Sequence, residues 1–300
     1  MAQPLGRRAP RPRAAVFAVF VSLALGLLLH AQQTFRSSTS IVAVYATVTD
    51  ARGALVTDLG AADFEISDNG ARQNITVFKS DVQPITIAIL LDTSPSLFPA
   101  AGRTASAVAE FTKRLMPGDR AAIGTFSHAV TLDPQLTSDP VTLLARLGAP
   151  GPWPAGTALW DAIEAGRAAL ANEGGRRVVL VVTDGADNAS RVDPNATRSA
   201  LQREGVMVCA ITVRGRFGLE TSEIGALANA TGGRSTTVQS ADDIAAAMQR
   251  IADELHQQYV LGFSPKTLDD KLHRLEVQVK RRDLVVRARR MYLASKTELR

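Results

Sequence analysis

Hydrophobic and polar residues follow two different patterns along the 300-residue chain, and the change between them falls near residue 82. Before this point, β-forming residues occur in short runs at 41–48, 64–67 and 75–78. The sequence Asp68-Asn69-Gly70 lies between the second and third runs and predicts a β-hairpin, because Asn-Gly is favoured in tight hairpin turns. Residues 40–80 are therefore expected to form β structure.

From residue 85 onwards, apolar strands alternate with helical segments. The strands are continuous apolar runs, typical of a parallel sheet covered on both faces, at residues 85–91, 121–126, 178–182 and 206–213. Helices are predicted near residues 101–116, 158–171, 198–204, 223–230 and 244–255, the last with its apolar residues on one face. This alternation predicts an α/β fold with a doubly wound, mostly parallel sheet.

Residues after the last predicted helix return to β character, at 259–263, 275–279 and 284–288. We expect residues 40–80 and 258–293 to pair into one small β layer beside the α/β core, because isolated hairpins are at best marginally stable. Residues 271–300 hold ten basic and three acidic residues, so this last β segment is strongly basic. The basic residues are expected to form a solvated strand face.

The N-terminal segment has the pattern of an export signal. Four arginines within the first 13 residues precede an uncharged apolar stretch at 14–29. This order predicts a secretory signal peptide at residues 1–31, cleaved after Ala31. The alternative is a membrane anchor retained at 14–29, although a spanning helix usually needs about 20 residues. In both cases we expect an exported protein that is periplasmic, secreted or attached to the cell envelope.

Net charge and cysteine content exclude several classes of function. The formal net charge is +5, but the four N-terminal arginines account for most of it, so nucleic-acid binding is not expected. Cys209 is the single cysteine, which excludes an intramolecular disulfide and a multi-cysteine zinc site. A nucleophile elbow, a phosphate-binding loop and a dinucleotide fingerprint are also missing from the sequence.

Polar side chains follow the predicted strands at their carboxyl ends, where open α/β sheets bind ligands. Asp92, Ser94 and Ser96 follow the strand at 85–91, and alternate residues of an extended loop point the same way. Thr157 precedes a helix and Asp184 follows another strand.

Together these five residues form an all-oxygen donor set. Such a set suits Mg²⁺, with Mn²⁺ or Ca²⁺ as alternatives. Without histidine or cysteine ligands, zinc and copper are poor candidates. Asp187 and Asn188 are expected in a polar loop beside the site.

The same residues carry a resemblance to a known family. Asp92-x-Ser94-x-Ser96, Gly156-Thr157 and Thr183-Asp184-Gly185 resemble the metal-ion-dependent adhesion site (MIDAS) of von Willebrand factor type A (VWA) domains, over residues 82–257. The resemblance implies a Rossmann-like fold that binds proteins through Mg²⁺, with an acidic side chain of the partner completing the coordination. It also implies that Ser94, Ser96 and Thr157 contact the ion, and that Asp92 and Asp184 do so directly or through water.

The flanking segments resemble the bacterial secreted VWFA-related proteins of the acidobacterial type. The residues concerned are Asp63-Phe64-Glu65 and Asp68-Asn69-Gly70 before the domain, and Gln258 to Phe263 with Pro265 after it. This resemblance extends over nearly the whole mature chain.

We therefore expect four segments: a signal peptide or anchor at 1–31, an N-terminal β segment at 32–81, a VWA domain at 82–257 and a basic β segment at 258–300. The expected function is Mg²⁺-dependent protein binding or adhesion without catalysis. Two alternatives stay open. One is a metal-assisted hydrolase or phosphotransfer enzyme on a similar sheet, and the other is a structural envelope protein whose metal stabilises the loops.

Overall fold

The computed structural model describes residues 41–147, 154–185, 187–214 and 222–296. The expected signal peptide at 1–31, and with it the alternative anchor at 14–29, lies outside these residues. Within the described ranges, no helix has both the length and the apolar character that crossing a membrane requires.

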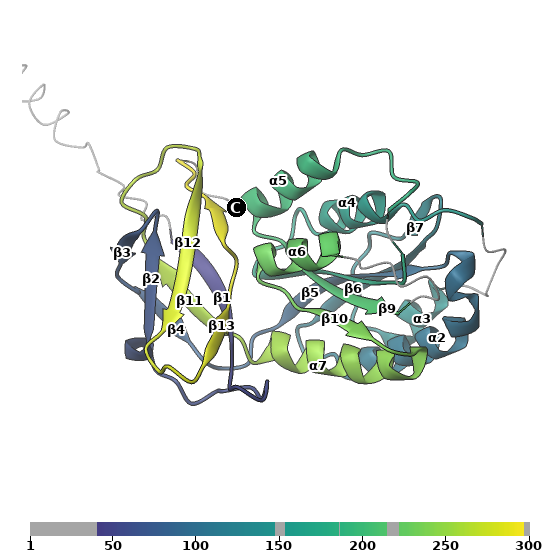
Figure 1. The fold of residues 1–300 in the computed structure, drawn as a ribbon, viewed down its shortest axis with the longest axis horizontal. Coiled ribbons are helices and arrows are strands. Elements are labelled where there is room, and N and C mark those ends of the chain that lie inside the picture. Colours follow the sequence, from purple (N-terminus) through teal and green to yellow (C-terminus); the bar gives the residue numbers. More distant parts are fainter. Residues whose placement is uncertain (1–40, 148–153, 186, 215–221, 297–300) are drawn as a thin grey trace, which may run out of the picture. The chain divides into compact units, whose positions relative to one another are not determined.

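A six-stranded sheet forms the centre of the α/β part (Figure 1). Its strand order is β10-β9-β8-β5-β6-β7. Neighbouring strands are parallel except for the last pair, β6 and β7, which is antiparallel. The four strands predicted from continuous apolar runs are confirmed, and β7 and β10 are short edge strands that the sequence pattern missed. The bounds are β5 (Ile85–Asp92), β6 (Arg120–Phe126), β7 (Val130–Leu132), β8 (Arg176–Thr183), β9 (Met207–Val213) and β10 (Ser235–Val238).

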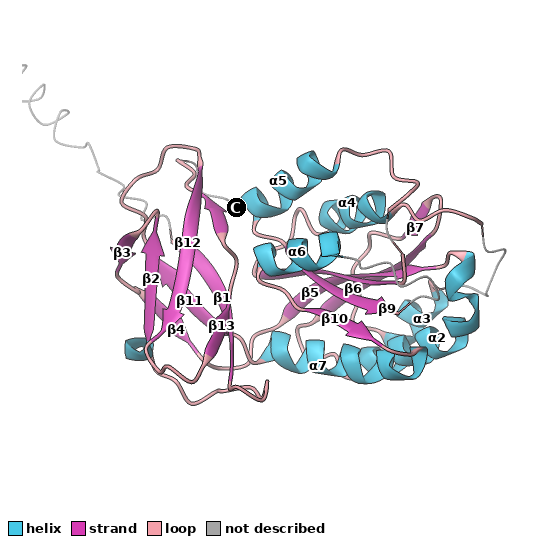
Figure 2. Cartoon of the chain, in the orientation of Figure 1, coloured by secondary structure: helices cyan, strands magenta, loops and turns pink. Residues whose placement is uncertain are grey.

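Helices cover both faces of this sheet, as the alternation predicted (Figure 2). Because side chains alternate along a strand, Ile87 and Ile89 of β5 pack on one face, and Ala88 and Leu90 pack on the other. The first face is covered by α2 (Ala101–Thr112), α3 (Pro140–Ala145) and α7 (Ile244–His256). The second is covered by α4 (Leu159–Ala169), α5 (Pro194–Glu204) and α6 (Ser222–Thr231).

The two flanks of the chain pair with each other, but they form two sheets rather than the expected single layer. The strand orders are β13-β1-β11-β4 and β14-β12-β2-β3. Both sheets contribute to one apolar cluster that includes Val44, Ile66, Phe263 and Tyr292. Two facing sheets bury the apolar side of each, which one layer of the same strands would leave uncovered. The bounds are β1 (Val42–Thr49), β2 (Phe64–Asp68), β3 (Ala71–Gln73), β4 (Val77–Lys79), β11 (Tyr259–Phe263), β12 (Leu272–Val279), β13 (Val285–Arg287) and β14 (Met291–Leu293).

The predicted hairpin turn is present, but it joins β2 to a strand that the sequence analysis did not recognise. Asn69 and Gly70 have φ values of +48° and +83°, as a two-residue turn of this kind requires. Asp68 then pairs with Ala71, so β3 follows the turn directly. The run at 75–78, expected as the second strand of the hairpin, instead contributes β4, which pairs with β11 in the other sheet.

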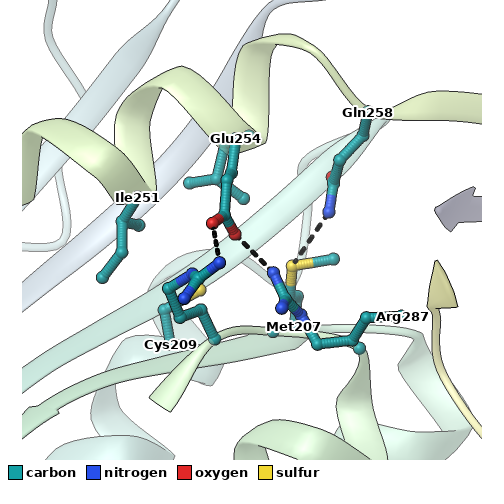
Figure 3. Close-up of a pocket in the computed structure, with 10 residues that line it drawn as sticks. Met207, Cys209, Ile251, Glu254, Gln258 and Arg287 are labelled. Atoms are coloured by element: carbon teal, nitrogen blue, oxygen red, sulfur yellow. Dashed lines mark hydrogen bonds and ion pairs between the residues drawn. The ribbon is translucent and has the colours of Figure 1, made fainter. Parts of the chain in front are cut away.

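Polar contacts hold the end of α7 both to the β sandwich and to the α/β part of the chain (Figure 3). The carboxylate of Glu254 forms ion pairs with Arg234 and with Arg287 of β13. Gln258, which follows the helix, donates to the hydroxyl of Thr47 in β1 at 3.0 Å. The guanidinium of Arg176 donates to a main-chain carbonyl in the last turn of α7, a favourable place for a positive charge.

Candidate functional site

The candidate site lies at the carboxyl ends of β5 and β8, which are neighbours in the central sheet. From β5 the chain crosses to β6 on one side and later enters β8 on the other side, so the strand order reverses between β5 and β8. Asp92 is the last residue of β5, and Thr183 is the last residue of β8. Open α/β sheets bind ligands at such a reversal, because the connecting loops separate there.

Asp92 is buried and makes hydrogen bonds with both carboxylate oxygens. One oxygen accepts from the main-chain N–H of Ser94 at 2.8 Å, and the other accepts from the hydroxyl of Thr183 at 2.6 Å. Burial raises the pKa of the Asp92 carboxyl above its ordinary value, despite these hydrogen bonds. The structure therefore holds this side chain in one orientation at a desolvated position.

Ser94, Ser96 and Asp184 form a chain of hydrogen bonds across the same strand ends. The hydroxyl oxygens of Ser94 and Ser96 are 3.1 Å apart, and Ser96 donates to Asp184 at 3.0 Å. Burial also raises the pKa of the Asp184 carboxyl. Ser94 is buried and Ser96 is exposed, so the cluster opens to solvent on the side of Ser96.

Thr157 is buried and lies beside the Asp184 loop. A Cβ atom on Gly185 would be 3.6 Å from the Thr157 hydroxyl oxygen. The preceding residue, Gly156, has φ of +111°, and a side chain there would meet Ala189 at 3.2 Å. A glycine is therefore required for the chain to enter Thr157 in this position. The structure thus brings the five predicted residues to one edge of the sheet.

The loop after β8 also caps the start of α4, which the sequence analysis missed. The helix begins after Ala158, whose side chain cannot accept a hydrogen bond. Asp187 accepts from the N–H of Leu159 at 2.9 Å, and the hydroxyl of Ser190 accepts from the N–H of Trp160 at 2.9 Å. These two side chains accept from N–H groups that have no partner within the helix, as the side chain of an N-cap residue usually does. The alanine at position 158, which cannot cap the helix, was the sequence signal that a side chain from elsewhere caps α4.

Asn188 of the same loop holds the main chain of Thr157. Its side-chain oxygen accepts from the Thr157 N–H at 2.8 Å, and its own N–H donates to the Thr157 carbonyl at 3.0 Å. Asp187 and Asn188 were expected only in a nearby polar loop. The hydrogen bonds show that they connect the segment carrying Thr157 to the segment carrying Asp184.

The donor set fits a hard divalent cation. Among the described residues, neither Asp92 nor Asp184 forms an ion pair, so one buried and one half-buried carboxylate share this edge without a basic partner. The hydroxyl and carboxylate oxygens of the cluster are 3.0 to 3.1 Å apart. Adjacent ligands of an octahedral Mg²⁺ ion would be about 3 Å apart, given bonds of about 2.1 Å. In the described part of the chain, no three or more His, Cys, Asp or Glu side chains are grouped so as to hold a metal ion, and the candidate site itself combines two carboxylates with hydroxyl groups.

An α/β sheet with oxygen donors at the point where its strand order reverses is typical of a ligand-binding domain. Comparison with known proteins identifies which kind of domain it is. Residues 87–186, about a third of the chain, match the family model of the von Willebrand factor type A domain. No curated protein sequence matches the chain.

Solved structures support the same fold. Proximal thread matrix protein 1 from the mussel byssus, with zinc in its MIDAS, superimposes with a TM-score of 0.53 at 24% identity, over 64% of this chain and 50% of its own. A von Willebrand factor type A protein from Catenulispora acidiphila gives a TM-score of 0.51 at 12% identity, over 88% of this chain and 78% of its own. The central sheet and its helices therefore have the VWA-type α/β fold, flanked by antiparallel strands.

Proposed function

We propose that this protein binds another protein through a divalent cation held by Asp92, Ser94, Ser96, Thr157 and Asp184. The observation that carries the proposal is a pair of carboxylates, one buried and one half-buried, that have no basic partner among the described residues and lie beside converging hydroxyl groups. The VWA-type fold supports a binding role, because VWA domains commonly bind protein partners.

The proposed ion is Mg²⁺, with Mn²⁺ or Ca²⁺ as alternatives. Two carboxylates and three neutral hydroxyls supply little negative charge, so the bound ion would remain electrophilic and keep several water ligands. An Asp or Glu side chain of the partner would replace one of these waters on the solvent side of Ser96. Zn²⁺ belongs in the same test, because the mussel protein holds zinc in its MIDAS although oxygen ligands alone make zinc a poor candidate.

Isothermal titration calorimetry with each of these four ions tests the metal site. We expect one ion per chain and a loss of affinity of about 100-fold in Asp92→Asn and Asp184→Asn, because each change removes a negative charge and replaces one carboxylate oxygen by an amide NH2 group. Asp253→Asn is the matched control, since Asp253 is exposed on α7. Equal affinity in the wild type and all three variants would refute the site.

Partner binding needs a separate experiment. Proteins captured from an envelope extract in Mg²⁺ should be released by EDTA, and purified candidates should bind Thr157→Ala more weakly than the wild type. Replacement of the partner's contacting Asp or Glu by Asn or Gln should have the same effect. A partner that binds equally in EDTA would place recognition on another surface, and turnover of a substrate would favour the enzyme alternative.

We also propose that the chain is exported, as a periplasmic, secreted or envelope-associated protein. The support is the basic segment followed by the apolar stretch at 14–29. Expression of the full chain with fractionation and N-terminal sequencing distinguishes the outcomes. A mature N-terminus near Gln32 supports cleavage, an intact N-terminus in the membrane fraction supports the anchor, and an intact cytoplasmic protein contradicts export.

A further inference from the structure

The main chain of Thr157 is held from a loop that lies 31 positions further along the sequence. Asn188 accepts from the Thr157 N–H, while the N–H groups of Asn188 and Ala189 both donate to the Thr157 carbonyl, at 3.0 and 3.3 Å. Both the N–H and the C=O of Thr157 therefore form hydrogen bonds with the loop after β8. The backbone position of Thr157 is set by that loop and not by its own segment alone.

Hydrogen bonds in both directions join the same loop to the beginning of α4. Asp187 and Ser190 accept from N–H groups in the first turn of the helix. In return, the carboxylate of Asp161 in α4 accepts from the N–H groups of Arg191 and Val192, at 2.9 and 3.0 Å. The Thr157 segment and residues 187–192 are therefore joined along their whole length.

Among the residues that the structure describes, the loop after β5 is joined to the end of β8 by side-chain hydrogen bonds and not by main-chain ones. Asp92 accepts from Thr183, and Ser96 donates to Asp184, so these links run between side chains at the end of β8. Of the described contacts, those made by Asn188 and Ala189 hold the main chain of Thr157 to the loop after β8, whose first residue is Asp184. Thr157 is buried and Asn188 is exposed, so the hydrogen bond between them is partly buried, and loss of the Asn188 acceptor would remove the protein partner of the Thr157 N–H.

We propose that Asn188 is a positioning residue of the metal site, which fixes the Thr157 hydroxyl relative to Asp184 and thereby favours a small divalent cation over a larger one. This inference rests on the proposed function. Mg²⁺ requires near-ideal octahedral geometry at about 2.0 to 2.1 Å, whereas Ca²⁺ accepts variable geometry at about 2.3 to 2.6 Å. A less firmly held Thr157 therefore weakens Mg²⁺ binding more than Ca²⁺ binding.

Two substitutions of nearly the same size separate the hydrogen bond from simple packing. Asn188→Leu removes the acceptor oxygen, whereas Asn188→Asp keeps it. Asn188→Ala removes it without adding an apolar branch and serves as the second variant if the leucine variant does not fold. The matched control is Asn195→Leu, because Asn195 is an exposed asparagine in α5 that hydrogen-bonds to Arg198.

The affinities for MgCl₂ and CaCl₂ are measured by calorimetry in separate titrations, with circular dichroism to monitor folding. Loss of a residue that orients a metal ligand typically costs about 10- to 100-fold in affinity. We expect this loss for Mg²⁺ in Asn188→Leu and a smaller loss for Ca²⁺, so that the ratio of the two affinities falls. Asn188→Asp should keep the wild-type ratio, because its added charge favours both ions, and Asn195→Leu should change neither affinity.

The outcomes separate this inference from the proposal on which it rests. If the wild type binds no divalent cation, the proposed function fails and this inference with it. If Asp92→Asn loses the ion but Asn188→Leu and Asn188→Ala bind both ions as the wild type does, only the role of Asn188 is refuted. A parallel loss of Mg²⁺ and Ca²⁺ affinity with an unchanged ratio would also contradict it, because that pattern indicates general loosening of the fold.

Discussion

Glu254 offers a direct test of the ion pairs that hold the end of α7 to Arg287 in the β sandwich and to Arg234 before β10. Its side chain is 7% exposed and forms ion pairs with Arg234 and Arg287, which are 26% and 23% exposed. Glu254→Gln keeps the size of the side chain and removes its charge, so two guanidinium groups would face each other without a counter-charge. Breaking a buried ion pair in this way costs about 3 to 5 kcal/mol. Because both arginines retain access to water, we expect the lower end, about 3 kcal/mol.

This loss is large enough to measure by urea unfolding. The transition is followed by far-UV circular dichroism and by tryptophan fluorescence, to which the buried Trp160 in α4 contributes. Coincident transitions are required before the free energies of unfolding are compared. The control is Asp253→Asn, whose side chain is 54% exposed and lies 3.8 Å from Arg114, so its effect should stay below about 0.5 kcal/mol. If Glu254→Gln unfolds at the same urea concentration as this control, the ion pairs do not stabilise the junction.

Three further predictions concern polar groups other than the five candidate metal ligands. Hydrogen bonds from two main-chain N–H groups and from His256 outweigh the effect of burial and lower the pKa of Asp119. The contribution of Asp119 to stability is therefore present above the ordinary aspartate pKa of about 3.9 and is lost as the pH falls through the lower folded-state pKa. Urea midpoints from pH 3 to 7 should vary less with pH in Asp119→Asn than in the wild type, and an identical pH dependence would contradict this. Burial raises the pKa of the Cys209 thiol to about 11, so a thiol reagent at pH 8 should modify it only after unfolding, and rapid labelling of the folded protein would show that the site is open. Ser190→Ala should lower the free energy of unfolding by about 1 kcal/mol because α4 loses a capping acceptor, and an unchanged melting temperature would show that Asp187 suffices.

The central strands could be predicted because each is a continuous apolar run buried on both faces of the sheet. The edge strands β7 and β10 are only three and four residues long and are mostly not buried, so no run of this kind marks them. The sandwich could not be derived from local pattern for another reason. The pairs between its two flanks join residues about 200 positions apart, such as Ile66 with Val277, and periodicity gives no information on which strands pair.

The candidate site was predictable as far as it depends on strand ends. Asp92 and Asp184 follow apolar strands directly, and the parallel arrangement brings those ends together. The role of Asn188 was not predictable in this way, because its side chain bonds to the main chain of Thr157 and leaves no residue pattern at position 157. Contacts that depend on a backbone group of a distant loop require the structure.

The division of the β sandwich between the two ends of the chain has a consequence for the order of folding. The α/β strands β5 to β10 follow one another in sequence, so this part can assemble while synthesis continues. β1 ends at Thr49, and its partner β11 begins at Tyr259. At about 5 to 20 residues per second, about 10 to 40 s would separate their emergence from the ribosome. During that interval β1 and β2 expose unpaired edges, which favour aggregation, so chaperone dependence of the nascent chain should centre on its first β segment.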